Sequence, residues 1–321
     1  MKRRQLPGMG REVSELCFGM GGFGTTTRGD VTDRLIATYL EAGGNFFDTA
    51  HCYLFWEENG EGASERELGA CLRRLGVRGR VVVASKGGHP DGGEAYRRPD
   101  DYLSPKTLTS DIDESLERLG DAHIDLYYLH RDDPRIPVAE IIDFLNQEIT
   151  RGRIGALGAS NWSVQRIAAA NAYAASKGLH GFVASSVMCS LADPDWKITP
   201  EPTMRCVTSD EEAWHTATQM PIVAYSATGA GYFARTPDSA NPPKNPANEA
   251  RRERARSLAS EIGCTPTQIA LAWLLHQPYP ILPLFCTTKP THLTEILASI
   301  DVSLTPDQVH WLRHGEEEKV R

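Results

Sequence analysis

Residues 19–30 read GMGGFGTTTRGD, and this stretch distinguishes between two possible α/β folds for the chain. Its first six residues have the G-x-G-x-x-G spacing of a dinucleotide-binding βαβ unit, and they follow the apolar run Leu16–Phe18. In such a unit the glycines open directly into a helix whose N-terminus binds phosphate. Here Gly24 is followed by a polar loop, although Asp48 stands about where a ribose-binding carboxylate is expected. The stretch therefore argues against a Rossmann unit and predicts that its glycines line the end of a first strand.

The rest of the chain alternates short apolar runs with amphipathic stretches, as expected for strands buried on both faces and the helices that cover them. The apolar runs predict strands at 15–19, 44–48, 81–86, 125–130, 154–159, 182–187, 221–226 and 280–285. The amphipathic stretches predict helices at 31–42, 64–75, 105–119, 137–151, 163–177, 211–219, 248–276 and 290–299, and a last short helix at 304–313. We expect the 248–276 stretch to form two helices, because Gly263 and Pro266 interrupt it.

Eight strands, each followed by a helix, are typical of a (β/α)8 TIM barrel. A doubly wound sheet more often has five or six strands and then a second domain of different character. The sequence contains neither a linker nor such a change, so it predicts an α/β fold with a single barrel domain over residues 1–321. Three connections, 54–63, 188–206 and 227–247, are long enough to enlarge the loops at the C-terminal face of the barrel.

Composition narrows the possible partners. The chain has 321 residues and a net charge of −8, which argues against a nucleic-acid partner. It has neither a secretory signal nor an apolar run long enough for a membrane span, so we expect no membrane partner. Its seven cysteines are scattered without a CxxC pair, which is typical of reduced thiols in a cytoplasmic protein. We therefore expect no metal, and either a monomer or a homo-oligomer.

The C-terminal ends of barrel strands carry catalytic groups in this fold. Asp48, Lys86 and His130 fall at such ends, and Tyr53 follows just beyond the second strand. A buried Lys86 is expected to favour tyrosinate and to lower the pKa of Tyr53, which would make the phenol a better proton donor. Alternatively, Asp48 and Lys86 form a structural ion pair, His130 bonds loop carbonyls, and Tyr53 is a packed surface tyrosine.

Five segments carry a resemblance to a known family: GGNFFDTAHCY, GASERELGACL, VVVASK, DLYYLHRDDP and IGALGASNW. In order and spacing they resemble the aldo-keto reductases, and the resemblance is least clear between 188 and 220. It implies a barrel that binds NADP(H) or NAD(H) without a Rossmann motif. By the same resemblance Tyr53 is the general acid in carbonyl reduction, Lys86 and Asp48 tune it, and His130 positions the carbonyl.

The resemblance also implies a cofactor site at the strand ends. Ser160 and Asn161 match positions that hold the nicotinamide carboxamide, although either residue, or Ser163, could instead cap the next helix. Tyr225 matches the aromatic residue that stacks on the nicotinamide ring. The implied cofactor-binding residues are Gly21, Ser160, Asn161, Ser186, Tyr225, Ser226, Gly229, Gly231, Thr287, Thr288, Lys289, His292 and Glu295.

Three positions depart from the family pattern. Where the family usually has a glutamine on strand 6, this chain offers Ser185 or Ser186, of which we favour Ser186. Cys286 replaces a common glycine, and Ile296 replaces an asparagine that often contacts adenine. The segment after strand 8 contains Lys289 and His292, which could bind a 2′-phosphate, so NADP(H) is favoured over NAD(H).

The enlarged loops bring aromatic and acidic residues toward the expected substrate site. Phe55, Trp56 and Trp196 are candidate substrate contacts, and together with loop carboxylates they suit a sugar-like aldehyde or ketone, or the corresponding alcohol. The same residues could equally pack a lid.

The residues at the same strand ends argue against two other functions of this barrel. A glycoside hydrolase needs two carboxylates there, but strands 4 and 7 offer His130 and Ser226. A metal-dependent hydrolase would need several His and Asp residues at strand ends. A cofactor-binding regulatory or sensor protein on the same barrel remains the alternative, although it has no need of a proton donor.

Overall fold

A closed parallel barrel forms the centre of the computed structural model of the chain, which describes residues 1–93, 96–98, 100–194, 203–234 and 245–315. All eight predicted strands are present, and they pair in the order β10-β11-β12-β3-β4-β5-β8-β9. Their bounds are β3 (Cys17–Gly19), β4 (Phe46–Asp48), β5 (Val82–Gly87), β8 (Ile124–Leu129), β9 (Ile154–Ser160), β10 (Phe182–Ser186), β11 (Ile222–Ala224) and β12 (Ile281–Phe285). The predicted (β/α)8 barrel is confirmed.

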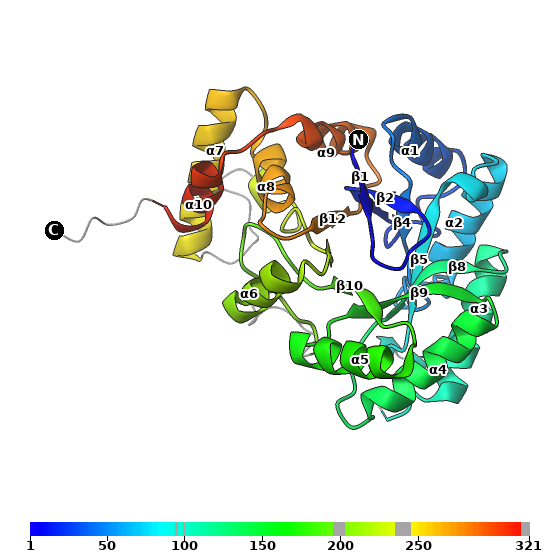
Figure 1. Cartoon of the computed structure of the whole chain (residues 1–321). Coiled ribbons are helices and arrows are strands. Elements are labelled where there is room, and N and C mark those ends of the chain that lie inside the picture. Colours follow the sequence, from blue (N-terminus) through cyan, green and yellow to red (C-terminus); the bar gives the residue numbers. More distant parts are fainter. Residues whose placement is uncertain (94–95, 99, 195–202, 235–244, 316–321) are drawn as a thin grey trace.

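The helices surround the strands on the outside of the barrel (Figure 1). Their bounds are α1 (Asp30–Glu41), α2 (Ala63–Arg74), α3 (Pro105–Leu119), α4 (Val138–Thr150), α5 (Val164–Lys177), α6 (Ser209–Thr218), α7 (Pro246–Ile262), α8 (Pro266–Leu275), α9 (Pro290–Leu297) and α10 (Pro306–His314), with short 3-10 turns at 78–80, 232–234 and 298–301. The division of the 248–276 stretch into two helices is confirmed, because Gly263 ends α7 in a left-handed conformation with φ 82°.

Helix α3 illustrates how local sequence sets these boundaries. Ser104 accepts a hydrogen bond from the backbone N–H of Thr107, Pro105 occupies the first turn, and Gly120 ends the helix with φ 63°. Leu108 and Ile112 are fully buried on the face that packs toward the barrel.

The GMGGFG stretch does not build a dinucleotide-binding turn. After β3 the chain makes a polar loop, and α1 begins only at Asp30. Gly24 has φ 116°, and a Cβ there would lie 2.3 Å from the carbonyl oxygen of Ala63, so this position requires glycine for close backbone packing. The Rossmann alternative is therefore excluded.

Two short hairpins were not predicted: β1 (Arg3–Gln5) with β2 (Glu12–Ser14), and β6 (Asp91–Gly93) with β7 (Tyr96–Arg97). The first lies across one end of the ring of strands (Figure 1), where Leu6, Met9 and Val13 join the core inside the barrel. Strands of two or three residues have no measurable apolar alternation, which explains why the sequence pattern missed them.

The inner core determines which strand residues face the barrel axis. Side chains of a strand alternate between its two faces. Phe46 of β4, Val82 and Ala84 of β5, and Leu126 and Tyr128 of β8 belong to the inner core. The next residues in the same alternation are Asp48, Lys86 and His130, so strand register alone directs these three polar groups toward one point above the apolar core.

Within the described residues, no helix combines the length and the apolar character that crossing a membrane would require.

Candidate active site

Lys86 is the centre of a buried hydrogen-bond network above the inner core. Its ammonium group donates to Asp48 Oδ1, to the carbonyl oxygen of Thr49 at 2.8 Å, and to Tyr53 Oη at 3.0 Å. The side chains of Lys86 and Asp48 are only 2% and 0% exposed. The network therefore brings together three of the four predicted catalytic residues in a water-poor setting.

The segment from Thr49 to Tyr53 is held in place by the neighbouring strand. Thr49 N donates to Ala84 O and His51 N donates to Lys86 O, both at 2.9 Å, so the segment continues the β4–β5 pairing past the end of β4. The imidazole of His51 also contacts Glu114 of α3, at 2.9 Å. These contacts orient the chain so that the Tyr53 phenol reaches Lys86.

The electrostatics of Tyr53 differ from the sequence-based expectation. Burial raises the pKa of Tyr53 to about 12, and the opposing effect of the Lys86 charge is smaller. The prediction that Lys86 gives Tyr53 a lowered pKa is therefore wrong, because burial destabilises the tyrosinate more than the charge of the ammonium group stabilises it. Burial disfavours the charged form of Lys86, but the Asp48 carboxylate helps to raise the pKa of Lys86 above its ordinary value. Lys86 is therefore a cation. Tyr53 is a neutral phenol at neutral pH.

His130 lies beside this network, directly after β8. Its backbone N–H donates to Gly87 O at 2.8 Å, and its ring centroid is 5.9 Å from that of Tyr53. Burial, followed by the nearby His89 and Arg131, lowers the pKa of His130 well below its ordinary value. The imidazole is therefore neutral at neutral pH, and it can donate one N–H bond and accept another.

These groups line a cavity of about 220 Å³ at the C-terminal end of the barrel. Its wall consists of Cys52, Tyr53, Trp56, Lys86, His89, Asp91, His130, Arg131, Ser160, Asn161, Met204, Tyr225 and Leu284. A larger hollow of about 470 Å³ lies between α8 and α10 outside the barrel, away from the strand ends. We take the smaller cavity as the candidate active site because the buried charged network opens into it.

Sequence reasoning missed several residues of this wall, above all Cys52, His89, Asp91 and Arg131. Two of them had a usable signal, since Cys52 precedes Tyr53 and Arg131 follows His130. His89 lies in the loop beyond the end of β5, and Asp91 begins the unpredicted strand β6, so the alternation of β5 does not determine the direction of either side chain.

Asn161 connects the predicted cofactor residues with the cavity. It has a left-handed backbone, φ 60°, and its side chain donates to Ser160 Oγ at 3.1 Å and His130 O at 3.3 Å. Its amide oxygen accepts from Tyr225 Oη at 2.7 Å. The cap of α5 is Ser163, which accepts from Arg166 N, so neither Ser160 nor Asn161 caps this helix.

Ser186 and Gly21 are predicted nicotinamide contacts that lie at the end of β10 and just after β3. Ser186 ends β10 with 0% exposure, and among the described residues its hydroxyl has no hydrogen-bond partner. A buried hydroxyl without a partner is unfavourable unless a ligand bonds to it. Gly21 lies against the Tyr53 ring, since a Cβ there would be 3.6 Å from it. The missing partner is a polar group such as a carboxamide could supply, but Ser186 does not itself line the cavity.

Only some of the predicted cofactor-binding side chains after β12 are available to a ligand. Lys289 and His292 are exposed, and Thr287 Oγ1 accepts from Lys289 N at 3.2 Å. Glu295 instead accepts from Thr265 Oγ1 at 2.6 Å and so connects α9 to the start of α8. Ile296, which stands where the family often has an adenine-contacting asparagine, is buried in the hydrophobic core.

The other predicted residues of this segment and of the loop after β11 are placed as follows. Thr288 is half-buried next to Gly22, whose Cβ would lie 3.7 Å from it. Ser226, Gly229 and Gly231 have positive φ values of 56°, 58° and 78°. They form tight turns after β11, where the backbone is accessible to a ligand.

The predicted substrate-binding residues do not all lie at the cavity. Trp56 lines the cavity and is 62% exposed. Phe55 does not line the cavity: its ring packs against His51, with centroids 5.4 Å apart, and against the guanidinium group of Arg118. Trp196 lies outside the described residues.

Comparison with known proteins agrees with the barrel fold. The profile described as "Aldo/keto reductase family" matches residues 15–314. A curated relative from Glycine max, "Probable aldo-keto reductase 1", is 29% identical over 94% of this chain and 85% of its own length. The crystal structure of a thermostable aldo-keto reductase, Tm1743, in complex with the inhibitor epalrestat superposes with a TM-score of 0.73. It is 22% identical and covers 98% of this chain and 99% of its own.

The chain therefore belongs to the aldo-keto reductase family. It is an oxidoreductase of a family that uses nicotinamide cofactors and acts on small molecules.

Proposed function

We propose that this protein transfers a hydride between NADP(H) and a small aldehyde or ketone, with Tyr53 as the general acid or base. The observation that carries the proposal is the 3.0 Å hydrogen bond from Lys86 Nζ to Tyr53 Oη at the wall of the cavity. Lys86 donates to the phenolic oxygen, so the phenolic O–H can be directed toward a carbonyl oxygen in the cavity.

The proton-transfer step follows from the charges. Tyr53 is protonated at neutral pH, and the neighbouring ammonium group stabilises the tyrosinate that forms once the proton has left. Asp48 keeps the ammonium group of Lys86 in position and charged. In the direction of alcohol oxidation, the tyrosinate of Tyr53 accepts the proton of the alcohol hydroxyl group.

His130 orients the carbonyl in this proposal. Its neutral ring can donate one N–H bond to the oxygen that also accepts the Tyr53 proton. The nicotinamide supplies the hydride when bound. Ser186 and Asn161 would hold its carboxamide, and Tyr225 would lie against its ring.

The cavity supports a hydroxylated, sugar-like substrate. Trp56 offers an exposed aromatic face at the cavity wall, and Asp91 and Arg131 offer polar groups. A preference for NADP(H) is supported by the exposed Lys289 and His292 after β12, because a 2′-phosphate needs a local cation.

The test combines cofactor binding with turnover. We would titrate the protein with NADPH and NADH by quenching of tryptophan fluorescence, and then assay a panel of hydroxyaldehydes and ketones. Tyr53→Phe removes only the hydroxyl group, so we expect kcat/KM to fall by about 10²–10⁴-fold while the Kd for the cofactor is unchanged.

Each failure points to a different error. Turnover retained by Tyr53→Phe would remove Tyr53 as the proton donor. A protein that binds NADPH but reduces no carbonyl of the panel would instead be a cofactor-binding regulatory protein. Absence of binding to either dinucleotide would overturn the proposed function altogether.

A further inference from the structure

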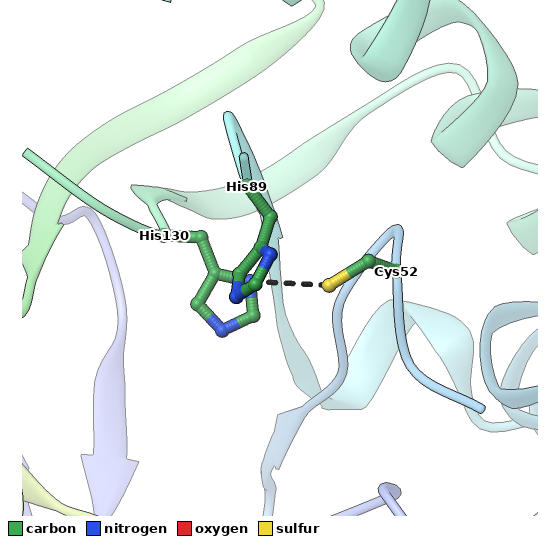
Figure 2. Close-up of side chains that lie close together, drawn as sticks. All are labelled: Cys52, His89 and His130. Atoms are coloured by element: carbon green, nitrogen blue, oxygen red, sulfur yellow. Dashed lines mark hydrogen bonds between the residues drawn. The ribbon is translucent and has the colours of Figure 1, made fainter. Parts of the chain in front are cut away.

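Three buried side chains with metal-binding atoms lie together beside Tyr53. Cys52, His89 and His130 come from the segments that follow β4, β5 and β8, and they are 3%, 8% and 8% exposed. Figure 2 shows the Cys52 sulfur and the two imidazole rings close to one another. One ligand atom of each residue lies within 4.8 Å of those of the other two, and Cys52 Sγ is 3.5 Å from His130 Nδ1.

This donor set matches the chemistry of zinc. Thiolate and imidazole are both common ligands of Zn²⁺, and three such ligands leave the fourth position of a tetrahedral ion for water or a substrate oxygen. Zn–S and Zn–N bonds place ligand atoms roughly 3.3–3.6 Å apart. The Cys52–His130 distance already has this value, and the longer distances in the cluster need shifts of roughly 1 Å.

His89 has to reorganise for this purpose. Its Nδ1 now accepts a hydrogen bond from the Asp91 N–H at 3.1 Å. Metal binding through Nδ1 replaces this bond, and binding through Nε2 moves the ring proton to Nδ1, so either mode breaks the contact. The Asp91 loop is therefore expected to move when metal binds.

Charges of both signs lie around Cys52. Burial has the largest effect on its thiol and raises the pKa to about 12, followed by the cations Arg131 and Lys86, which lower it, and the carboxylates Asp111 and Glu65, which raise it. Zinc binding therefore has to stabilise a buried thiolate. Lys86 also contacts the Asp48 carboxylate directly. On binding, the Cys52 thiol releases its proton to solvent and a sulfur–metal bond forms, with no change of oxidation state.

We propose that Cys52, His89 and His130 bind one Zn²⁺ ion, and that the bound ion occupies the part of the cavity where the carbonyl group would bind. The binding site rests on the geometry of these side chains alone. Its inhibitory effect rests on the proposed function, in which the carbonyl compound binds in the cavity that these three residues line. Zinc is therefore expected to act as a reversible inhibitor that competes with the carbonyl compound.

The binding experiment uses the full chain after treatment with a chelator. Calorimetric titration with ZnCl₂ should give one ion per chain, and CoCl₂ should produce a thiolate-to-cobalt charge-transfer absorption. Cys52→Ser should abolish this absorption, and Cys52→Ser and His89→Ala should each weaken zinc binding by more than about tenfold. The matched control is Cys264→Ser, a half-buried free cysteine next to α8, which should retain both signals.

Thermal melting of each variant, together with His89→Gln as a second substitution of that residue, separates lost ligation from lost folding. Zinc binding that is unchanged in folded Cys52→Ser, or a cobalt complex without thiolate absorption, would overturn the site.

The inhibition experiment is read separately. Zinc should raise KM for the carbonyl substrate and leave kcat unchanged, and His89→Ala should need more zinc for the same effect. Bound zinc that leaves reduction unaffected, or increases it, would overturn the competitive role while the binding data stand. A folded protein that binds zinc but reduces no carbonyl would show that the proposed function, not the metal site, has failed.

Discussion

Lys86 shows how much of the candidate chemistry depends on one residue. Its ammonium group contacts Asp48, the Thr49 carbonyl and Tyr53, and it is 2% exposed. A buried charge of this kind is tolerated only when partners compensate it. Stability and proton transfer are therefore coupled at this position, and a suitable pair of substitutions can separate them.

We expect Lys86→Met to lower the free energy of unfolding by about 3–5 kcal/mol, because it leaves the Asp48 carboxylate buried without its partner. The double variant Asp48→Asn, Lys86→Met removes both charges and should recover much of this loss. Carbonyl reduction should stay low in both, since neither supplies a cation to Tyr53. Urea denaturation and steady-state kinetics measure the two effects, and recovered activity in the double variant would contradict the role of Lys86.

At the scale of the element, strand register and helix caps position the site independently of each other. The residues that continue the inward alternation of β4, β5 and β8 are Asp48, Lys86 and His130. Where β9 leads into α5, Ser160 and Asn161 take part in the polar network of the cavity, whereas Ser163 caps the helix. Neighbouring polar residues thus have different functions, which the sequence alone left open.

Substitution of Ser163 tests this division. Ser163→Ala should destabilise the protein by about 1 kcal/mol, because the N–H of Arg166 loses its acceptor, and cofactor binding should be unchanged. Ser176→Ala in the same helix is the matched control, since its exposed hydroxyl bonds only a carbonyl within that helix. Equal unfolding free energies for the two variants would show that the cap contributes nothing.

At the scale of the whole molecule, the barrel is closed at the end opposite the site by the β1–β2 hairpin (Figure 1). Leu6 is fully buried and packs with Met9 and Val13 against the inner core. The apolar interior beneath the Lys86 network is thereby shielded from water.

Leu6→Ala should lower the free energy of unfolding by about 2–5 kcal/mol, because a cavity would form inside the barrel. Ile262→Ala, at a position that is 41% exposed, is the control and should have a much smaller effect. Denaturant titrations of both variants provide the comparison. A Leu6→Ala protein as stable as the parent would mean that the hairpin does not close the core.

The amino-acid sequence by itself determined the barrel. The apolar periodicity predicts the eight buried strands and the helices between them. The backbone preferences of Gly263 and Pro266 predict the break between α7 and α8. The positions of Asp48, Lys86 and His130 at strand ends predict that these side chains lie together. These features depend on residues near one another in the chain, so pattern is sufficient to predict them.

Only the tertiary structure decided the remaining features. The pKa of Tyr53 depends on how deeply neighbouring segments bury the phenol, and burial proved stronger than the Lys86 charge. Phe55 faces His51 and Arg118, and Cys52 and His89 meet His130 from segments far apart in the sequence. Depth of burial and contacts between distant loops are properties of the packed molecule, because they depend on distances that no local pattern encodes.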